Sequence, residues 1–269
     1  MRRTGLMVLT VLALLAVTFA PAFAVTDGEP DGNGHPYVGL MVADDANGSP
    51  LWRCGGTLIA PQVFLTAGHC TEAPAVRATI WFEADVQSSQ VALGYPYGGK
   101  TSVDGKTYTH PQFDPNAFYL YDLGVVILDK PYTTKVYGAL PRLDALDSLA
   151  RGATFTAVGY GTQKSFPDAA SWKNESYKIR MVAYPSLIQI NGGIVGDSSL
   201  LLSNNAHTGG TCFGDSGGPN FIGNSNVVGG VTSFGMNGNC AGTGGVYRVD
   251  RADDLNWLYS TFGAYLKKK

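Results

Sequence analysis

The chain has 269 residues, 45% of them hydrophobic, so it is long and apolar enough to bury a sizeable core. Its formal net charge is −2, and only 15% of its residues are charged, against a usual share of about 25%. This charge excludes a strongly basic nucleic-acid-binding protein, and the short basic tail Lys267–Lys269 is interpreted as a solvated end. The 35 glycines and 14 tyrosines favour many short strands joined by turns.

Residues 1–24 predict a secretory signal rather than part of the fold. Arg2 and Arg3 precede an uncharged, largely apolar run, 6–19, and the residues Ala22-Phe23-Ala24 form an A-x-A cleavage site. A membrane anchor is the alternative, but the run is shorter than the roughly 20 residues needed to span a bilayer. Cleavage would leave 245 residues (269 − 24) with a net charge of −4 (−2 − 2). We therefore expect a secreted, extracellular protein that is soluble and not membrane-bound after signal removal.

The remaining chain alternates short apolar or β-rich runs with turns rich in glycine and proline. In the first half, strands are expected at 37–43, 51–59, 63–67, 76–82, 90–93, 106–110 and 123–128. A poorly patterned connection follows, with a boundary between two halves around 141–151. In the second half, strands are expected at 153–160, 179–184, 199–202, 227–234 and 245–249. The pattern indicates an all-β protein and allows either one long domain or two barrels.

One convincing helix ends the chain. Its apolar residues have helical spacing, and two acids suit the N-terminus of a helix. The apolar residues are Trp257, Leu258, Phe262 and Leu266, and the acids are Asp253 and Asp254.

Four cysteines fall into two distant pairs, one in each half of the chain. An even number in a secreted protein predicts two disulfides, with three possible connectivities. Pairing within each half is the simplest choice, which gives Cys54–Cys70 and Cys212–Cys240. A zinc site is the alternative, but no pair has C-x₂-C spacing.

The residues Thr211-Cys212-Phe213-Gly214-Asp215-Ser216-Gly217-Gly218-Pro219 predict a tight turn around a serine. Glycine adopts positive φ without steric cost, so such a turn exposes backbone N–H groups that converge on one point. Ser216 could act there as a nucleophile if a base lies beside it in the fold. An ordinary surface loop with an incidental serine is the alternative.

His69 is the best candidate base among four histidines. A strand runs into a small-residue turn before it, and a disulfide at Cys70 would hold the imidazole in place. The other three, His35, His110 and His207, lie in predicted loops. An acid is needed to orient the histidine. Asp122 opens the buried run 123–128 and Asp129 closes it, and composition alone does not separate these two.

Three separated motifs resemble the chymotrypsin/trypsin family of serine peptidases, in a secreted, bacterial-type form. They are Leu65-Thr66-Ala67-Gly68-His69-Cys70, Asp122-Leu123-Gly124-Val125-Val126-Ile127-Leu128 and Gly214-Asp215-Ser216-Gly217-Gly218-Pro219. The resemblance extends to 55–59, 233–235, 245–247 and the terminal helix, and covers nearly the whole mature chain.

The resemblance implies a peptidase domain at 25–269. Two packed six-stranded antiparallel barrels, about 25–145 and 146–250, would precede a C-terminal helix at about 252–266. His69, Asp122 and Ser216 would form the catalytic triad in the cleft between the barrels. The N–H groups of Gly214 and Ser216 would form the oxyanion hole. The resemblance also supports both disulfide pairings.

No metal or organic cofactor is required for this chemistry. Some relatives have a calcium loop, for which Glu83 and Asp85 are candidates, but a solvated loop is the preferred interpretation.

In relatives, the acid before the nucleophile pairs with a newly formed N-terminal amine, which orders the oxyanion hole. The familiar Ile-Val-Gly-Gly start is missing here, but Val25 lies in the corresponding place and is freed by cleavage after Ala24. We therefore expect an activation pair between Val25 and Asp215. The alternative is that Val25 is simply the mature terminus and Asp215 has local partners.

Family spacing places the base of the substrate pocket at Gly210, where the trypsin branch has an acid. The other expected pocket residues are Thr211, Ser233, Phe234, Gly235 and Gly245. An open, mostly apolar pocket predicts cleavage of proteins or peptides after large hydrophobic residues rather than Arg or Lys. The expected function is a secreted, monomeric serine endopeptidase. The alternatives are a catalytically silent binding homologue and an esterase on the same fold.

Overall fold

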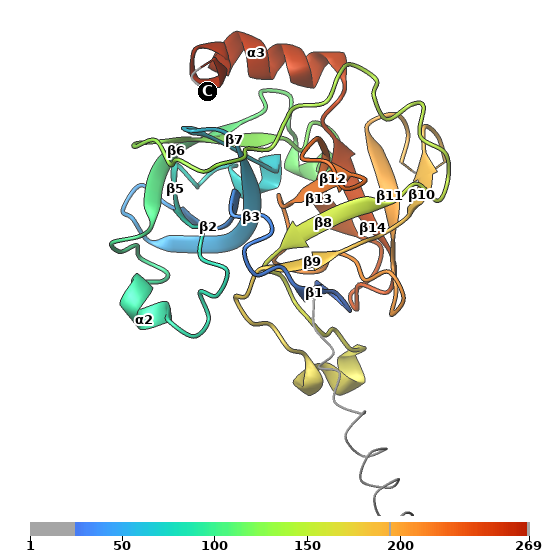
Figure 1. Ribbon diagram of the computed structural model, residues 1–269, viewed down its shortest axis with the longest axis horizontal. Coiled ribbons are helices and arrows are strands. Elements are labelled where there is room, and N and C mark those ends of the chain that lie inside the picture. Colours follow the sequence, from blue (N-terminus) through green and yellow to red (C-terminus); the bar gives the residue numbers. More distant parts are fainter. Residues whose placement is uncertain (1–24, 194, 268–269) are drawn as a thin grey trace, which may run out of the picture.

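The computed structural model describes residues 25–193 and 195–267, so the predicted signal at 1–24 lies outside the described residues. The first half forms a closed antiparallel barrel with strand order β2-β3-β4-β7-β6-β5 (Figure 1). Its strands are β2 (Val38–Asp44), β3 (Pro50–Ala60), β4 (Val63–Thr66), β5 (Arg77–Trp81), β6 (Val103–Thr109) and β7 (Gly124–Leu128). Leu40, Phe64 and Val126 are fully buried, as expected for β-branched and bulky side chains inside a closed sheet.

Seven strands of the second half and β1 of the N-terminal segment form an eight-stranded sheet with the order β1-β9-β8-β12-β13-β14-β11-β10. Its strands are β1 (Glu29–Pro30), β8 (Phe155–Gly159), β9 (Met181–Ala183), β10 (Leu187–Ile190), β11 (Ser199–Asn204), β12 (Pro219–Ile222), β13 (Val228–Gly235) and β14 (Gly242–Arg248).

The predicted strand at 179–184 contains β9, whereas β10 was not predicted. Pro185 lies between them and has no N–H to donate to a ladder. As a result β9 pairs with β8, whereas β10 pairs with β11 at the other end of the sheet. The segment before β8 and the start of β10 also approach each other, because Leu187 N donates to Ala153 O at 2.8 Å and Thr154 bridges to Ser186. The sheet therefore curls into the second barrel-like unit that the sequence predicts.

The predicted strand at 90–93 is wrong, because these residues form the short helix α2 (Gln90–Leu93). Val91 is 96% exposed, whereas Leu93 is half-buried and packs against the core, so the run is not buried as a strand of the barrel would be. Gly94 ends the helix in the left-handed conformation (φ 71°) and donates back to Gln90 and Val91.

The predicted C-terminal helix is confirmed as α3 (Ala252–Leu266), with Asp253 and Asp254 in its first turn. Figure 1 shows α3 lying across the first barrel, although it follows the last strand of the second sheet. Phe262 is buried and contacts Tyr108 of β6 edge to face. Among the described helices, none combines the length and apolar character that crossing a bilayer requires.

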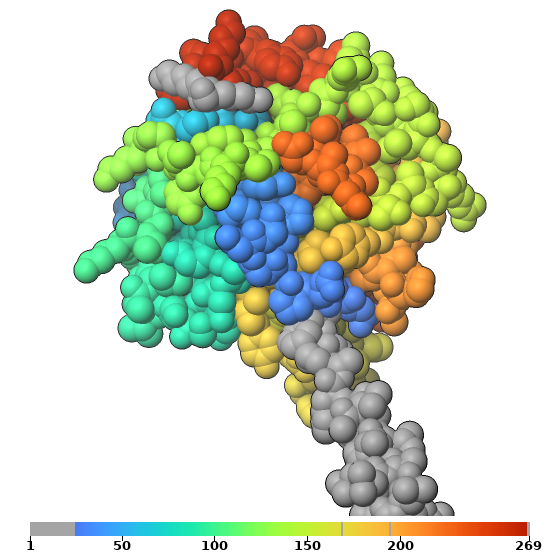
Figure 2. Space-filling model, viewed as in Figure 1, coloured from blue at the N-terminus to red at the C-terminus, as the bar shows by residue number. Residues whose placement is uncertain are grey.

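A buried arginine joins the N-terminal segment to both barrels. Arg180 donates from Nε to the Asp31 carboxylate at 2.9 Å and from Nη2 to Gly32 O at 2.7 Å. Its Nη1 donates to Val38 O, Phe82 O and the Tyr160 hydroxyl. Figure 2 shows the N-terminal residues, in blue, on the face where the two halves meet. The guanidinium therefore joins the N-terminal segment, the first barrel and the second sheet at one point.

Candidate active site

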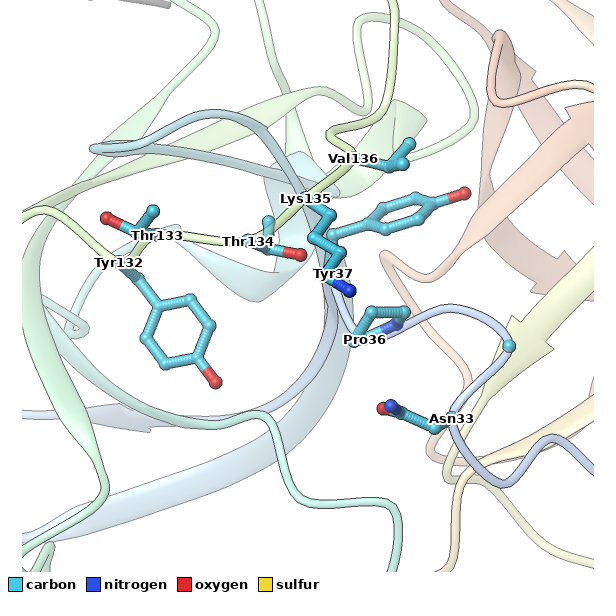
Figure 3. Close-up of a pocket in the computed structure, with 9 residues that line it drawn as sticks. Asn33, Pro36, Tyr37, Tyr132, Thr133, Thr134, Lys135 and Val136 are labelled. Atoms are coloured by element: carbon cyan, nitrogen blue, oxygen red, sulfur yellow. The ribbon is translucent and has the colours of Figure 1, made fainter.

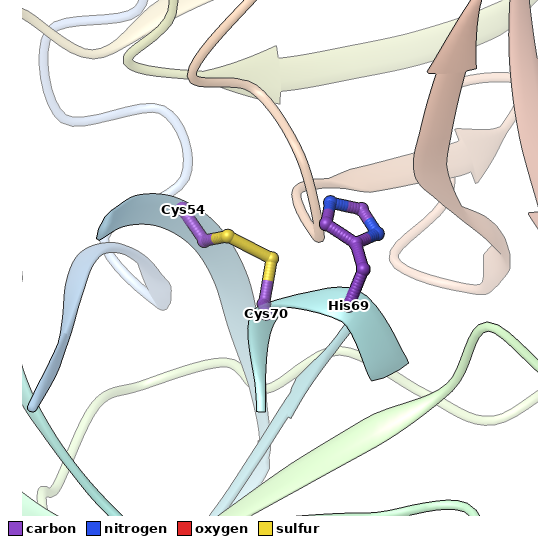
Figure 4. A group of neighbouring side chains, drawn as sticks. All are labelled: Cys54, His69 and Cys70. Atoms are coloured by element: carbon purple, nitrogen blue, oxygen red, sulfur yellow. A yellow bond between two sulfur atoms is a disulfide. The ribbon is translucent and has the colours of Figure 1, made fainter. Parts of the chain in front are cut away.

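His69 lies in the 3-10 turn η1 (Gly68–Cys70), which directly follows β4. The disulfide Cys54–Cys70 ties this turn to β3, and Trp52 Nε1 donates to Cys70 O at 3.0 Å. Figure 4 shows the imidazole turned away from the disulfide. Cys54, His69 and Cys70 bring three potential metal-ligand atoms together, but both sulfurs are consumed by the disulfide. The cluster therefore fixes the position of the histidine and offers no thiolate to a metal.

The imidazole of His69 is held by the fully buried carboxylate of Asp122. Nδ1 lies 2.9 Å from Oδ2 and 3.1 Å from Oδ1, and the backbone N–H of His69 donates to Oδ1 at 2.8 Å. The hydroxyl of Ser233 in β13 also donates to Oδ2, at 2.5 Å. Burial lowers the pKa of His69, but the hydrogen bond and the charge of Asp122 more than compensate and leave it raised. The contact leaves Nε2 as the ring nitrogen available to accept a proton.

The other candidate acid and the other three histidines lie away from the serine turn. Asp129 is half-exposed and paired with Arg77 on the surface. His35 contacts Asp31, and His110 is buried beside Tyr121 and Trp257. His207 follows β11 in a turn in which its N–H donates to Asn205. Of the four histidines and two acids considered, only His69 and Asp122 meet beside the serine turn.

The turn that carries Ser216 packs directly against β3 and the end of β4. Gly55 N donates to Ser216 O at 2.7 Å, and Gly217 N donates to Thr232 O at 2.8 Å. Gly217 has a φ of 76°, and a Cβ there would lie 2.1 Å from Thr66 Oγ1 and 2.9 Å from Ala67 N. Only glycine allows this approach, which places Ser216 next to the segment leading to His69.

The turn also leaves two backbone donors available. Gly214 has a φ of 93°, which favours glycine. Within the described residues, the N–H groups of Gly214 and Ser216 donate to no acceptor. Other amides of the turn already have acceptors, since Asp215 N donates to Cys212 O and Gly218 N donates to Asp215 O. The two amides can therefore bind an oxygen supplied by a ligand.

Asp215 is fully buried beneath the turn. Its carboxylate accepts from Gly161 N at 2.7 Å and from Cys212 N at 2.9 Å. Burial raises its pKa to about 6, partly offset by these two bonds and by the charge of Arg53. The predicted disulfide Cys212–Cys240 is present beside it. Asp215 thus has two local hydrogen bonds but no cation in direct contact among the described residues.

Val25 lies close to the segment that leads into this turn. It is 1% exposed and packs in a small apolar cluster with Met181 and Ala183. The next residue, Thr26, pairs with Gly210, whose N–H donates to Thr26 O at 3.0 Å. Val25, the predicted partner of Asp215, is therefore held through Thr26 beside Gly210, which lies two residues before Cys212.

A cavity of about 270 Å³ opens beside Ser216. Of the predicted pocket residues, Thr211, Ser233, Phe234 and Gly235 line it. Gly210 and Gly245 do not, because the Asn204 side chain covers Gly210 and the ring of Phe234 covers Gly245. This corrects the predicted lining.

Sequence reasoning missed several residues that line the cavity. Phe118 reaches it from the first half and contacts Phe234 edge to face, and the exposed Phe213 joins them. Phe213 is an aromatic residue in a glycine-rich turn, which could have indicated it, whereas Phe118 is followed by Tyr119 and Leu120 and no local signal distinguishes it. The remaining residues are Cys212, Thr232 and Cys240, and none of the lining residues is acidic.

A larger hollow, about 710 Å³, lies elsewhere, between Asn33–Tyr37 and Tyr132–Val136 (Figure 3). Its lining includes hydroxyl groups and Lys135 but no histidine or carboxylate that could activate a nucleophile. We therefore place the chemistry at the smaller cavity beside Ser216.

Two barrel-like β units with a serine turn and a histidine–aspartate pair at their junction define a two-barrel serine endopeptidase. The Trypsin family model matches residues 29–255, and the chain therefore belongs to the trypsin family.

Individual relatives agree with this assignment. Chymotrypsin from Phaedon cochleariae is 28% identical over 255 residues, covering 88% of this chain and 82% of the relative. Brachyurin from Leptuca pugilator is 26% identical over 214 residues, covering 77% of this chain and 84% of the relative. The solved structure of HL collagenase superposes with a TM-score of 0.70 at 24% identity, covering 88% of this chain and 98% of that one, and supports the fold.

Proposed function

We propose that the chain is a secreted, monomeric endopeptidase in which Ser216, His69 and Asp122 cleave peptide bonds after large apolar residues. The observation that carries the proposal is the buried Asp122 carboxylate. It binds His69 from one side and Ser233 from the other, and Ser233 and Ser216 line the same cavity. Export with residues 1–24 as the signal, and barrels divided near residue 145, belong to the same proposal.

The chemistry follows from the residue types. Ser216 Oγ attacks the peptide carbonyl carbon while His69 Nε2 takes the hydroxyl proton. The carbonyl oxygen becomes an oxyanion and accepts from the N–H groups of Gly214 and Ser216, each worth roughly 3–4 kcal/mol in comparable sites. His69 then gives its proton to the leaving nitrogen as the C–N bond breaks. Water, deprotonated by His69, attacks the resulting ester and releases the acid and the free serine.

The aromatic lining supports the preference for apolar residues. A side chain buried among Phe118, Phe213 and Phe234 gains hydrophobic free energy, and no lining acid neutralises a cation. We expect Leu, Phe, Tyr or Met before the cleaved bond to exceed Ala by roughly 10- to 150-fold in kcat/KM, or about 1.5–3 kcal/mol.

Cleavage-site profiling of the secreted enzyme on a peptide library measures this preference. The same preparation carrying Ser216→Ala reveals any contaminating protease. Cleavage mainly after Arg or Lys would contradict the apolar pocket, and no cleavage by the wild-type enzyme would contradict the function itself.

We further propose that signal removal creates the activating amine at Val25. Burial raises the pKa of Asp215, so a cation placed beside it would be stabilised, and Thr26 is already paired next to this turn. An enzyme that starts at Val25 is expected to be active. One extra residue before Val25 should cost roughly 10²- to 5 × 10³-fold in kcat/KM, the effect of losing a buried ion pair of about 3–5 kcal/mol.

Mass spectrometry of the active secreted enzyme determines its first residue. The matched control carries one extra residue after Lys269 instead and should keep full activity. A different first residue, or an active enzyme with the N-terminal extension, would contradict the proposed pairing of Val25 with Asp215.

A further inference from the structure

Arg53 lies beside the serine turn but outside the cavity next to Ser216. It precedes Cys54 in β3, and its guanidinium packs on Gly214, where an added Cβ would lie 2.6 Å from Nη2. Nη2 also donates to Ser176 Oγ at 3.1 Å. Arg53 is not among the residues that line the apolar cavity.

A second cation, Lys178, shares an aromatic neighbour with Arg53. Its Nζ lies 5.3 Å from the centre of the Tyr95 ring. Burial raises the pKa of Tyr95, and the neighbouring charge of Arg53 partly offsets this rise. Burial lowers the pKa of Lys178, and the charge of Arg53 lowers it further. The two cations therefore lie close enough to repel each other.

Neither cation is neutralised by an acid. In the described part of the chain, no salt bridge includes Arg53 or Lys178, and Lys178 Nζ donates to the neutral Gln87 at 3.1 Å. Glu175 pairs with Lys164, and the Asp85 carboxylate, near Lys178 in the fold, accepts from Ser88 N and Oγ. Two like charges without a salt bridge, one of them packed on the serine turn, are stabilised when a carboxylate binds between them.

We propose that Arg53 and Lys178 form a subsite for a carboxylate on the leaving-group side of the cleaved bond. The inference rests on the proposed function, because the cavity then holds the side chain before that bond. The chain beyond the bond must leave Ser216 away from the cavity, and on that side Arg53 lies against Gly214. The subsite selects peptides with Asp, Glu or the terminal carboxylate one or two residues after the bond.

Three matched peptides test the subsite. They share an apolar residue before the bond and differ two residues after it: Glu with an amidated end, Gln with an amidated end, and Gln ending in a free carboxylate. At low ionic strength, kcat/KM for the Glu peptide should exceed that for amidated Gln by about tenfold, or about 1.4 kcal/mol. The ratio should approach one at 1 M salt, where the Debye length is about 3 Å.

For each variant, kcat/KM for the amidated Glu peptide is divided by kcat/KM for the amidated Gln peptide. This ratio cancels changes in folding or total activity. Arg53→Gln and Lys178→Gln should each lower the ratio, and Arg53→Glu should lower it furthest. Arg151→Gln, which removes an exposed arginine from the connection before β8, is the matched control and should keep the wild-type ratio.

The outcomes separate the two proposals. Equal kcat/KM for all three peptides overturns the carboxylate subsite and leaves the endopeptidase function standing. A preference shown only by the free-carboxylate peptide supports the subsite and identifies a chain terminus as its ligand. Failure to hydrolyse any apolar peptide overturns the proposed function.

Discussion

Replacing Ser216 with alanine is expected to lower kcat for peptide hydrolysis by about 10⁵- to 10⁶-fold, because the nucleophile of the proposed acyl-enzyme is lost. The residual rate should come from the N–H groups of Gly214 and Ser216, which the substitution keeps in place. The fold should be unaffected, since the described contacts of this residue run through its backbone carbonyl to Gly55 N. Steady-state kinetics on an apolar peptide and labelling by a serine-directed phosphonate provide the measurement.

Ser260→Ala is the matched control. Ser260 is exposed in α3 and donates to Trp257 O within the same helix, so its loss should change neither the rate nor the labelling. His69→Ala should also prevent labelling, because the serine then lacks its base. A protein that binds peptides but never takes the label would support the silent binding alternative, and a labelled Ser216→Ala variant would contradict the assignment of the nucleophile.

The sequence predicted those parts of the site that depend on short, local patterns. The glycines around Ser216 can be interpreted because the turn needs positive φ at Gly214 and Gly217. The choice between Asp122 and Asp129 could not be made locally. The two residues flank the same buried strand, and only the barrel closure directs one to His69 and the other to the surface.

Features that depend on distant contacts were missed for the same reason. Phe118 enters the cavity from a loop nearly a hundred residues before the serine turn, and no periodicity indicates that approach. Gly210 and Gly245 were expected to line the cavity, but the Asn204 side chain and the Phe234 ring pack over them. Family spacing gives the order of positions along a strand, but it does not predict which neighbouring side chain fills the space above a glycine.

Arg180→Met is expected to destabilise the protein by about 3–5 kcal/mol, the usual cost of leaving one partner of a buried ion pair without the other. Arg180 and Asp31 side chains are 1% and 2% exposed, and the guanidinium also satisfies carbonyls of both the N-terminal segment and β2. Urea unfolding with the disulfides intact measures the change. The Ser216→Ala background is used so that autolysis does not remove the unfolded protein.

The surface pair Arg77–Asp129 is the matched control, because its side chains are 46% and 50% exposed. Arg77→Met should cost less than about 1 kcal/mol, since exposed ion pairs contribute little. If Arg180→Met costs no more than Arg77→Met, the buried network does not join the two halves energetically. The double variant Asp31→Leu with Arg180→Met should recover part of the loss, because no unpaired charge then remains buried.

The same network predicts how stability changes with pH. Burial raises the pKa of Asp31, but the hydrogen bonds from His35 and Arg180 outweigh burial and hold it below its ordinary value. A carboxyl group with a lowered pKa in the folded state stabilises the protein above its unfolded pKa, and this contribution is lost as the pH falls through the folded pKa. Wild type should therefore lose more stability than the double variant when the pH is lowered into the acid range. Equal losses would show that Asp31 is not ionised against Arg180.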